Sequence, residues 1–433
     1  MKKFFIKTLG CKTNQAESAA MADILTAGGF IETENALEAD YYILNSCSVT
    51  HTADTKNLSY LRRIKKENPN VKTVLTGCMA QLEKENLIKN NTADFVIGNY
   101  EKNDAAKILA SGIKYSVSDI FSHKDFRSAE FKRTKKTRAF VKIQDGCNSR
   151  CSYCTIPYAR GISRSAPAAS IIKQINELAE AGFYEAALTG IHIGQWGLDF
   201  KEPETLMKLL EKIEETEIKR YRLGSLTPDE LDEKFIDFLA SSKKFCPHFH
   251  LSLQSCSDNT LKAMNRHYNA EKISEIVNYI NKKFDSAFTG CDIIAGFPGE
   301  TEADFEETRK NLENLKLSKM HIFPYSRRNG TLADTMPEQI KEEEKKRRAD
   351  ILQKMSDDKC FNFLKSNINT IQEVIIEKSR DKKTNLLKGV TRNYINVLVK
   401  GAENIMDTVQ NVIITGFADD NAKMAAEIIN QAE

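Results

Sequence analysis

Three cysteines stand close together in one short segment that follows a β-rich run. Cys147, Cys151 and Cys154 have the spacing C-x3-C-x2-C. Thiolates are soft ligands, and three of them on one loop can surround a metal centre. Structural zinc normally takes four tetrahedral nitrogen or sulfur ligands, and the segment has no obvious fourth one. Three thiolates and an open position favour a [4Fe–4S] cluster with one exchangeable site. Zinc, or three unrelated loop cysteines, are the alternatives.

Three further cysteines lie far apart in the sequence but in similar surroundings. Cys11, Cys47 and Cys78 each come just after a predicted parallel strand, at residues 3–8, 41–44 and 71–75. Ligands bind at this edge of an open parallel sheet, so neighbouring strands would bring the three thiols together. A single free cysteine is more often a buried apolar side chain. Three cysteines at equivalent places predict a second cluster.

The remaining cysteines and the histidines show no ligand spacing. We expect buried or half-buried thiols at Cys246, Cys256, Cys291 and Cys360. We expect mostly structural roles for His51, His123, His248, His250, His267 and His321.

The elements that must position these cysteines follow an alternating pattern. In residues 1–113, short β-rich runs separated by helical patterns predict a Rossmann-like parallel α/β domain. Residues 114–138 are expected to form a basic linker, since residues 123–142 hold eight Lys and Arg. Residues 139–366 are expected to form a partial (β/α)6 barrel of the TIM type and a charged helix from residue 338. Its predicted strands are 139–143, 185–191, 220–224, 248–254, 288–294 and 319–323.

The tail has a different character. Residues 367–433 are predicted to form a small β-barrel, with strand runs at 373–376, 394–399 and 412–414. Residues 378–400 carry seven Lys and Arg against Asp381 alone. A charge run is usually a solvated surface, but a basic β domain with an interleaved aromatic residue also suits a nucleic-acid backbone. The candidate RNA-binding residues are Lys378, Arg380, Lys382, Lys383, Lys388, Arg392 and Tyr394.

Composition excludes several classes of protein. The chain has 433 residues, of which 41% are hydrophobic and 28% charged, and its net charge is +3. These values are ordinary for a globular protein. No run approaches the roughly 20 apolar residues of a membrane span, and the amino terminus lacks a secretory pattern. We therefore expect a cytoplasmic protein with reduced thiols and no membrane partner.

Several segments closely resemble the methylthiotransferases, a branch of the radical S-adenosylmethionine (SAM) enzymes, and the resemblance covers essentially the whole chain. The tail resembles the TRAM domain, a small RNA-binding β-barrel. Residues 9–14, Leu-Gly-Cys-Lys-Thr-Asn, are most similar to the branch that acts on N6-threonylcarbamoyladenosine in transfer RNA. The segments that carry the resemblance are 8–15, 45–50, 76–81, 98–102, 142–147, 154–161 and 296–300.

The resemblance implies two [4Fe–4S] clusters and SAM as cofactors. Cys147, Cys151 and Cys154 would hold the SAM-binding cluster, and Cys11, Cys47 and Cys78 an auxiliary cluster that delivers sulfur. Residues at predicted strand ends of the barrel are expected to contact SAM; they are Thr189, Gly190, Arg222, Ser225, Gln254, Ser255 and Asp292. The turn at 296–299 and Tyr153 are possible adenine contacts or plain packing residues. Cys256 departs from the family, which usually has Gly there.

The implied reaction is methylthiolation of C2 of N6-threonylcarbamoyladenosine at position 37 of transfer RNA, with two SAM molecules. A 5′-deoxyadenosyl radical can remove hydrogen from an unactivated carbon, which acid–base catalysis does not readily reach. The implied partners are the anticodon stem-loop, an external electron donor and a sulfur source. One alternative is the same chemistry on isopentenyladenosine or on a ribosomal protein side chain. A second alternative is an RNA-binding protein with a structural metal centre.

Overall fold

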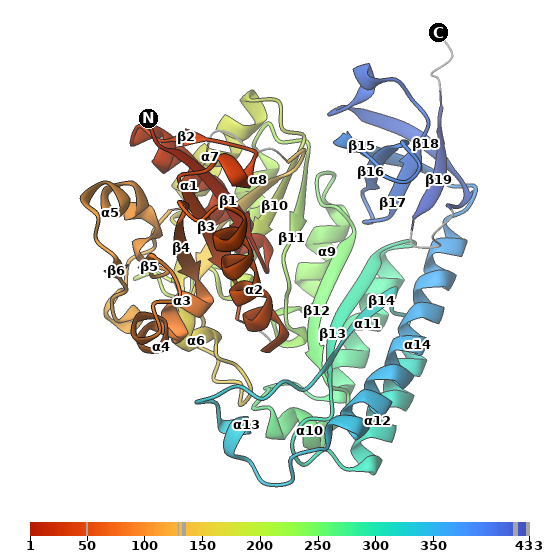
Figure 1. Ribbon diagram of the computed structural model, residues 1–433. Coiled ribbons are helices and arrows are strands. Elements are labelled where there is room, and N and C mark those ends of the chain that lie inside the picture. The colour runs from red at the N-terminus through yellow and green to blue at the C-terminus, as the bar shows by residue number, and fades with distance from the viewer. Residues whose placement is uncertain (49–50, 129, 132–135, 419–422, 430–433) are drawn as a thin grey trace.

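Three units follow one another along the chain. The amino-terminal unit, which carries Cys11, Cys47 and Cys78, lies against the central unit (Figure 1). The structure is a computed structural model, and it describes residues 1–48, 51–128, 130–131, 136–418 and 423–429. The side chain of His51 lies outside the described part. No helix among the described residues is long and apolar enough to cross a membrane.

The amino-terminal unit is a six-stranded parallel sheet of strand order β2-β1-β3-β4-β5-β6. Strand β3 is buried along its whole length, as its apolar run requires when helices cover both faces of a sheet. The Rossmann-like prediction is confirmed, and β6 extends the sheet past the predicted boundary at residue 113. The strands are β1 (Lys3–Thr8), β2 (Ile31–Glu32), β3 (Tyr41–Ser46), β4 (Lys72–Gly77), β5 (Phe95–Ile97) and β6 (Tyr115–Ser116). The helices are α1 (Lys12–Ala27), α2 (His51–Glu67), α3 (Cys78–Leu82), α4 (Lys84–Lys89) and α5 (Ala105–Ser111).

The central unit contains the six predicted parallel strands in chain order, within a residue or two of their expected ends. They form two three-stranded sheets, which the bridges Tyr221–Phe245 and Leu226–Leu251 join. This confirms the partial (β/α)6 barrel. The strands are β7 (Ala139–Lys142), β10 (Glu185–Thr189), β11 (Arg220–Leu223), β12 (His248–Gln254), β13 (Phe288–Ala295) and β14 (Lys319–Pro324). A short hairpin, β8 (Gln144–Asp145) with β9 (Arg164–Ser165), flanks the first strand.

Helices surround these strands, and each helix buries its apolar face against the barrel. The main hydrophobic core of the protein lies between the barrel strands and these helices. The connecting helices are α6 (Ile156–Arg160), α7 (Ala168–Glu180), α8 (Leu206–Glu214), α9 (Glu233–Ser241), α10 (Asp258–Ala263), α11 (Ala270–Lys283), α12 (Glu302–Asn314) and α13 (Leu332–Thr335). Helix α14 (Glu342–Ser366), the predicted charged helix, leads out toward the third unit (Figure 1).

The third unit is a closed five-stranded barrel of order β15-β16-β17-β19-β18, as expected for a TRAM-like domain. One expectation is wrong: Tyr394 does not belong to a strand but lies in the turn between β16 and β17. Its φ of +67° is a left-handed conformation that a tight turn needs and a strand cannot contain. The strands are β15 (Ile371–Arg380), β16 (Leu387–Thr391), β17 (Asn396–Val399), β18 (Val409–Phe417) and β19 (Met424–Ile428).

Candidate functional site

The loop that carries Cys147, Cys151 and Cys154 lies just beyond the carboxyl end of the first barrel strand. Backbone bonds hold it in place: the Cys147 amide donates to Gly161 O at 3.1 Å, and the Cys154 amide to Cys151 O at 3.1 Å. Gly146 precedes the loop with a φ of +71°, and a Cβ there would lie 1.9 Å from a backbone oxygen. The three thiols are free and half-buried. A rigid loop thus presents three thiols at the rim of the barrel.

Two cationic side chains contact these thiols, and the sequence analysis missed both. His192 Nδ1 lies 3.6 Å from Cys147 Sγ, and its Nε2 lies 2.5 Å from a carboxylate oxygen of Glu230. Although burial opposes the shift, the hydrogen bond from His192 lowers the pKa of Cys147. Arg266 Nη1 donates to Cys151 Sγ at 3.2 Å. The His192 contact favours the Cys147 thiolate, and a thiolate is the form that binds metal. The signal that could have found His192 is its position two residues after Gly190.

The second set of cysteines also lies at one edge, as predicted. Thr8 pairs with Asn45 and Ser46 with Gly77, so the next residues of β1, β3 and β4 reach the same edge of the sheet. A Cβ on Gly10 would lie 2.8 Å from Cys47 Sγ, which shows how closely the first two cysteine loops approach. Cys11 is exposed, Cys47 half-buried and Cys78 buried.

The donor sets fit the expected clusters. Each set offers three cysteine thiols. In the part of the chain that the structure describes, no three His, Cys, Asp or Glu side chains lie close enough to hold a single metal ion. Three thiolates spread over a loop or a sheet edge match the three protein ligands of a [4Fe–4S] cluster with an open iron.

Helix α1 brings the two cysteine sets toward each other. It begins at Lys12, directly after Cys11, and Thr13 Oγ1 donates to Gly190 O at 3.1 Å. The same hydroxyl lies 3.1 Å from Thr189 Oγ1. Thr189 ends β10 at the barrel rim where the Cys147–Cys154 loop also lies. The cysteine edge of the first sheet therefore sits on the rim of the barrel.

The other residues that were expected to contact SAM differ in their exposure and in their hydrogen-bond partners. Ser225 is exposed, and Gln254 is half-buried with a φ of +66° at an irregular end of β12. Asp292 Oδ1 lies 3.0 Å from His250 Nε2; burial raises the pKa of Asp292 to about 7 and lowers that of His250 to about 4. Ser255 is fully buried and hydrogen-bonded to Thr308 of α12 at 3.0 Å, so it points into the protein.

Cys256, the departure from the family pattern, lies in the main core. Its side chain is fully buried, and its carbonyl accepts a 2.7 Å hydrogen bond from Asn311. Burial raises the pKa of this thiol, which disfavours a thiolate. Cys246 and Cys291 are likewise buried, and Cys360 is half-buried. These four thiols therefore occupy the kinds of position that we expected.

Arg222 has a different role from the expected one. Its guanidinium is fully buried and binds Glu185 at 3.1 Å, Arg392 O at 2.8 Å and Thr391 O at 3.1 Å. The Tyr394 ring lies 4.9 Å from it. Arg222 thus ties the β16–β17 turn to the central barrel, and its donors are used there. Sequence alone placed it on the correct strand but could not show which domain it faces.

The seven candidate RNA-binding residues of the tail fall into two groups, one facing the central barrel and one on the small barrel. Arg392 donates to Lys243 O and Phe245 O at 2.6 and 2.8 Å, and the Tyr394 ring lies 4.2 Å from the His248 ring, so both face the central barrel. The other five lie on the small barrel itself. Lys378, Lys382 and Lys383 are exposed, while Arg380 and Lys388 are half-buried.

Lys12 extends from α1 into the space between the domains. Its ammonium lies 5.6 Å from the Tyr394 ring. Burial lowers its pKa, and the charges of Arg222 and Arg138 act in the same direction. Among the described residues, its ammonium makes no hydrogen bond and no ion pair. A half-buried cation therefore stands next to Cys11 without a directly bonded anionic partner, although the charges of Tyr394 and Glu185 oppose the lowering of its pKa.

Comparison with known proteins agrees with this architecture. Residues 3–98 match the Uncharacterized protein family UPF0004, and residues 141–312 match the Radical SAM superfamily. The solved radical S-adenosylmethionine methyltransferase TsrM from Kitasatospora setae has the same fold over 77% of both chains, with a TM-score of 0.55 and 14% identity. The barrel fold and the match to the superfamily together show that this chain is a radical SAM enzyme. Enzymes of this class use SAM and a [4Fe–4S] cluster.

Curated relatives define the family more closely. The chain is 36% identical to "Threonylcarbamoyladenosine tRNA methylthiotransferase MtaB" of Aquifex aeolicus, over 95% of this chain and 100% of that protein. It is 34% identical to the Bacillus subtilis protein of the same name, over 94% and 92% of the two chains. It is also 36% identical to "tRNA-2-methylthio-N(6)-dimethylallyladenosine synthase" of Dictyoglomus thermophilum, over 96% of both chains. The chain belongs to the radical SAM tRNA methylthiotransferases.

Proposed function

We propose that this enzyme attaches a methylthio group to C2 of N6-threonylcarbamoyladenosine at position 37 of transfer RNA. The observation that carries the proposal is the contact of Thr13 with Thr189 and Gly190, because it seats the Cys11, Cys47 and Cys78 edge on the rim beside the Cys147–Cys154 loop. Two cysteine sets that face one substrate space suit a reaction with one radical-generating centre and one sulfur-delivering centre.

The cofactors in this proposal are two [4Fe–4S] clusters and SAM. Cys147, Cys151 and Cys154 would hold one cluster, and Cys11, Cys47 and Cys78 would hold the auxiliary one. When bound, these groups supply a 5′-deoxyadenosyl radical for removal of the C2 hydrogen, a sulfur atom, and a methyl group from a second SAM. An electron donor and a sulfur source are external requirements of this chemistry.

The chain's own side chains hold and orient these groups. His192 and Arg266 donate to the sulfurs of Cys147 and Cys151, and the His192 contact favours the thiolate form of Cys147. Thr189, Gly190, Ser225 and Gln254 lie at or just past strand ends at the rim, where a barrel enzyme binds its substrate, and Asp292 lies within β13 (Phe288–Ala295). Ser255 supports this rim from behind through Thr308.

The transfer RNA would contact the small barrel through its exposed basic surface. Lys378, Lys382 and Lys383 are the proposed phosphate contacts, with Arg380 and Lys388 beside them. Arg392 and Tyr394 are left out because they face the central barrel. The anticodon stem-loop would then extend from the small barrel toward the space between the cysteine sets.

Lys12 favours the threonylcarbamoyl substrate over the dimethylallyl one. The threonylcarbamoyl group carries a carboxylate, whereas the dimethylallyl group is a hydrocarbon. The unpaired ammonium beside Cys11 is complementary to the carboxylate and would be poorly matched to a hydrocarbon. Relatives named for either substrate match this chain, so their names alone do not decide between them.

We expect Lys12→Met to reduce kcat/KM for RNA containing threonylcarbamoyladenosine about tenfold to a hundredfold, the size of one hydrogen bond to a charged group. SAM cleavage without RNA should not change. Lys3→Met is the matched control, because Lys3 is an exposed lysine at the opposite end of β1. An unchanged kcat/KM in Lys12→Met would contradict the assignment of the carboxylate to Lys12.

Nucleoside mass analysis tests the proposed function itself. Transfer RNA from a strain that lacks this gene should lose the 2-methylthio derivative of threonylcarbamoyladenosine and regain it on complementation. Persistence of that nucleoside, with loss of the dimethylallyl counterpart, would support the alternative substrate. Unaltered transfer RNA would support a binding protein with a structural metal centre and would refute the proposal.

A further inference from the structure

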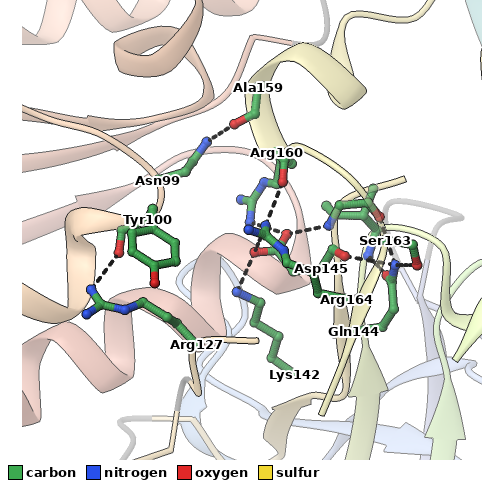
Figure 2. A network of polar contacts seen from close by, with 12 residues as sticks. Asn99, Tyr100, Arg127, Lys142, Gln144, Asp145, Ala159, Arg160, Ser163 and Arg164 are labelled. Carbon is green, nitrogen blue, oxygen red and sulfur yellow. Dashed lines mark hydrogen bonds and ion pairs between the residues drawn. The ribbon is translucent and has the colours of Figure 1, made fainter. Parts of the chain in front are cut away.

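Six charged side chains meet in the buried interface between α1 and the central barrel. Glu17 of α1 accepts hydrogen bonds from Lys142 at 2.8 Å, from Arg160 at 2.5 Å and from Lys102. Asp145 accepts from Lys142 at 2.8 Å and from Arg160 at 3.1 Å (Figure 2). Arg164 lies 3.6 Å from Asp145 and donates to Arg160 O at 2.6 Å. All six side chains are buried.

This network contains more positive than negative charge. Two carboxylates, Glu17 and Asp145, stand against four cations, Lys102, Lys142, Arg160 and Arg164. Of two neighbouring carboxylates, Asp104 pairs with Arg127, and Glu101 accepts from Ser118 through Oε1 while its Oε2 is buried without a hydrogen-bond partner. Uncompensated buried charge is strongly destabilising. An anion is therefore expected close to the network.

The network also has unused hydrogen-bond donors. Arg160 Nε and Arg164 Nε and Nη1 are buried and have no hydrogen-bond partner. A cavity of about 20 Å³ borders the network at Arg164 and has room for one water molecule. A water there would pair with a donor but would supply no negative charge.

The unsatisfied network lies beside the loops of the second cysteine set. Arg160 Nη2 donates to Asn14 Oδ1 at 2.5 Å, and Asn14 Nδ2 donates to Leu9 O at 2.9 Å and to Ser46 O at 3.0 Å. These carbonyls belong to the segments that lead into Cys11 and Cys47. Helix α6, which ends at Arg160, packs against α3, which begins at Cys78.

The pKa values of two cations in the network, Arg160 and Lys102, also depend on Cys78. Burial lowers the pKa of Arg160, yet the charges of Glu17 and Asp145, with a smaller contribution from Cys78, hold it well above its usual value. Burial also lowers the pKa of Lys102, against the opposing charges of Glu17 and Cys78. Both cations therefore lie close enough to Cys78 to respond to a charge placed there.

We propose that the excess positive charge of this network is the counter-charge of the auxiliary cluster, with Arg160 as the residue that positions the cluster against the Cys147–Cys154 loop. The inference rests on the proposed function for the assignment of that cluster to Cys11, Cys47 and Cys78. Arg160 lies six residues after Cys154 and binds Asn14, so one side chain connects both cysteine sets.

The charge part of the proposal predicts a change in reduction potential. A cluster gains a negative charge on reduction, so a nearby cation favours its reduced state. Lys102→Met should therefore lower the potential of the auxiliary cluster. Lys142→Met is the comparison variant, because Lys142 is another cation of the network that binds Glu17. We expect a clearly larger shift for Lys102→Met.

The experiment uses the full chain with Cys147, Cys151 and Cys154 replaced by alanine, so that only the auxiliary cluster is present. Iron content after anaerobic reconstitution and an EPR-monitored redox titration are measured for each lysine variant. About four irons per chain and a lower potential in Lys102→Met support the inference. Four irons with potentials unchanged from the background chain in both variants overturn it, while the proposed function stands. A background chain without iron overturns the auxiliary cluster itself.

The positioning part has its own readout in the protein with all its cysteines. When both clusters are reduced, their magnetic coupling in EPR reports their separation and relative orientation. Arg160→Gln should weaken or broaden that coupling while about eight irons remain, and Arg160→Lys should restore it in part. Coupling that is identical in wild type and Arg160→Gln would overturn the positioning role. If Arg160→Gln does not fold, an unchanged coupling in Arg160→Lys and in Asn14→Ala would do so.

Discussion

Cys151→Ala will lose about half of the iron and all SAM cleavage, whereas Cys11→Ala will lose about half of the iron but keep SAM cleavage. The expected total after anaerobic reconstitution is about eight irons per chain, four for each cysteine set. Cys151 belongs to the loop that would bind the SAM cluster, and Arg266 donates directly to its sulfur. Cys11 stands on the opposite domain, so its loss should spare formation of 5′-deoxyadenosine and abolish only the methylthiolated product.

Cys360→Ala is the matched control for both variants. Cys360 is a half-buried thiol on α14 that packs against the core of the small barrel, and it belongs to neither cysteine set. It should keep all the iron and both activities. Iron near four per chain that does not respond to Cys11→Ala would contradict the auxiliary cluster. Retained SAM cleavage in Cys151→Ala would contradict the assignment of the loop.

Glu185→Ala should destabilise the protein by about 3–5 kcal/mol, the usual cost of breaking a buried ion pair by removing one partner. Glu185 is fully buried and binds Arg220 at 2.8 Å and Arg222 at 3.1 Å. Its loss would leave two guanidiniums buried with much less negative charge. Because both arginines also bind the small barrel, hydrogen exchange at residues 387–399 should rise along with the loss of stability.

Urea unfolding measures the change, and Glu204→Ala is the control. Glu204 pairs with Lys212 at 3.1 Å in a partly exposed position, so its removal should cost less than about 1 kcal/mol. Burial raises the pKa of Glu185, but Arg222 and Arg220 outweigh it and hold that pKa well below the usual value. Its stabilising effect is therefore present above about pH 4.3 and lost as the pH falls toward the folded-state pKa. Equal midpoints for the two variants would contradict a structural role for Glu185.

Local patterns predicted the units of this fold well. The six barrel strands and the three strands before Cys11, Cys47 and Cys78 lie where β-rich runs stand in the sequence. Those runs are buried on both faces or alternate with helices, so short-range periodicity is enough to locate them. Cys11, Cys47 and Cys78 could be grouped for the same reason, since parallel strands end at a common edge.

Side-chain partners across domains could not be predicted in this way. Arg222 was expected at the substrate side but binds a turn about 170 residues later in the chain, and Tyr394 leaves the strand pattern to face the central barrel. Long charged side chains reach several neighbours, and the one they contact depends on how whole domains dock. His192 and Arg266 were missed because each becomes meaningful only beside a cysteine far away in the sequence.

The sequence by itself determined the class of chemistry, because cysteine spacing and strand ends are local features that survive in any arrangement of domains. Only the tertiary structure decided how the two cysteine sets face each other and which cations lie beside them. Those features depend on the docking of α1 on the barrel rim through Thr13 and on the buried network around Glu17 and Arg160. Contacts between residues more than a hundred positions apart leave no periodic trace in a single sequence, so packing alone reveals them.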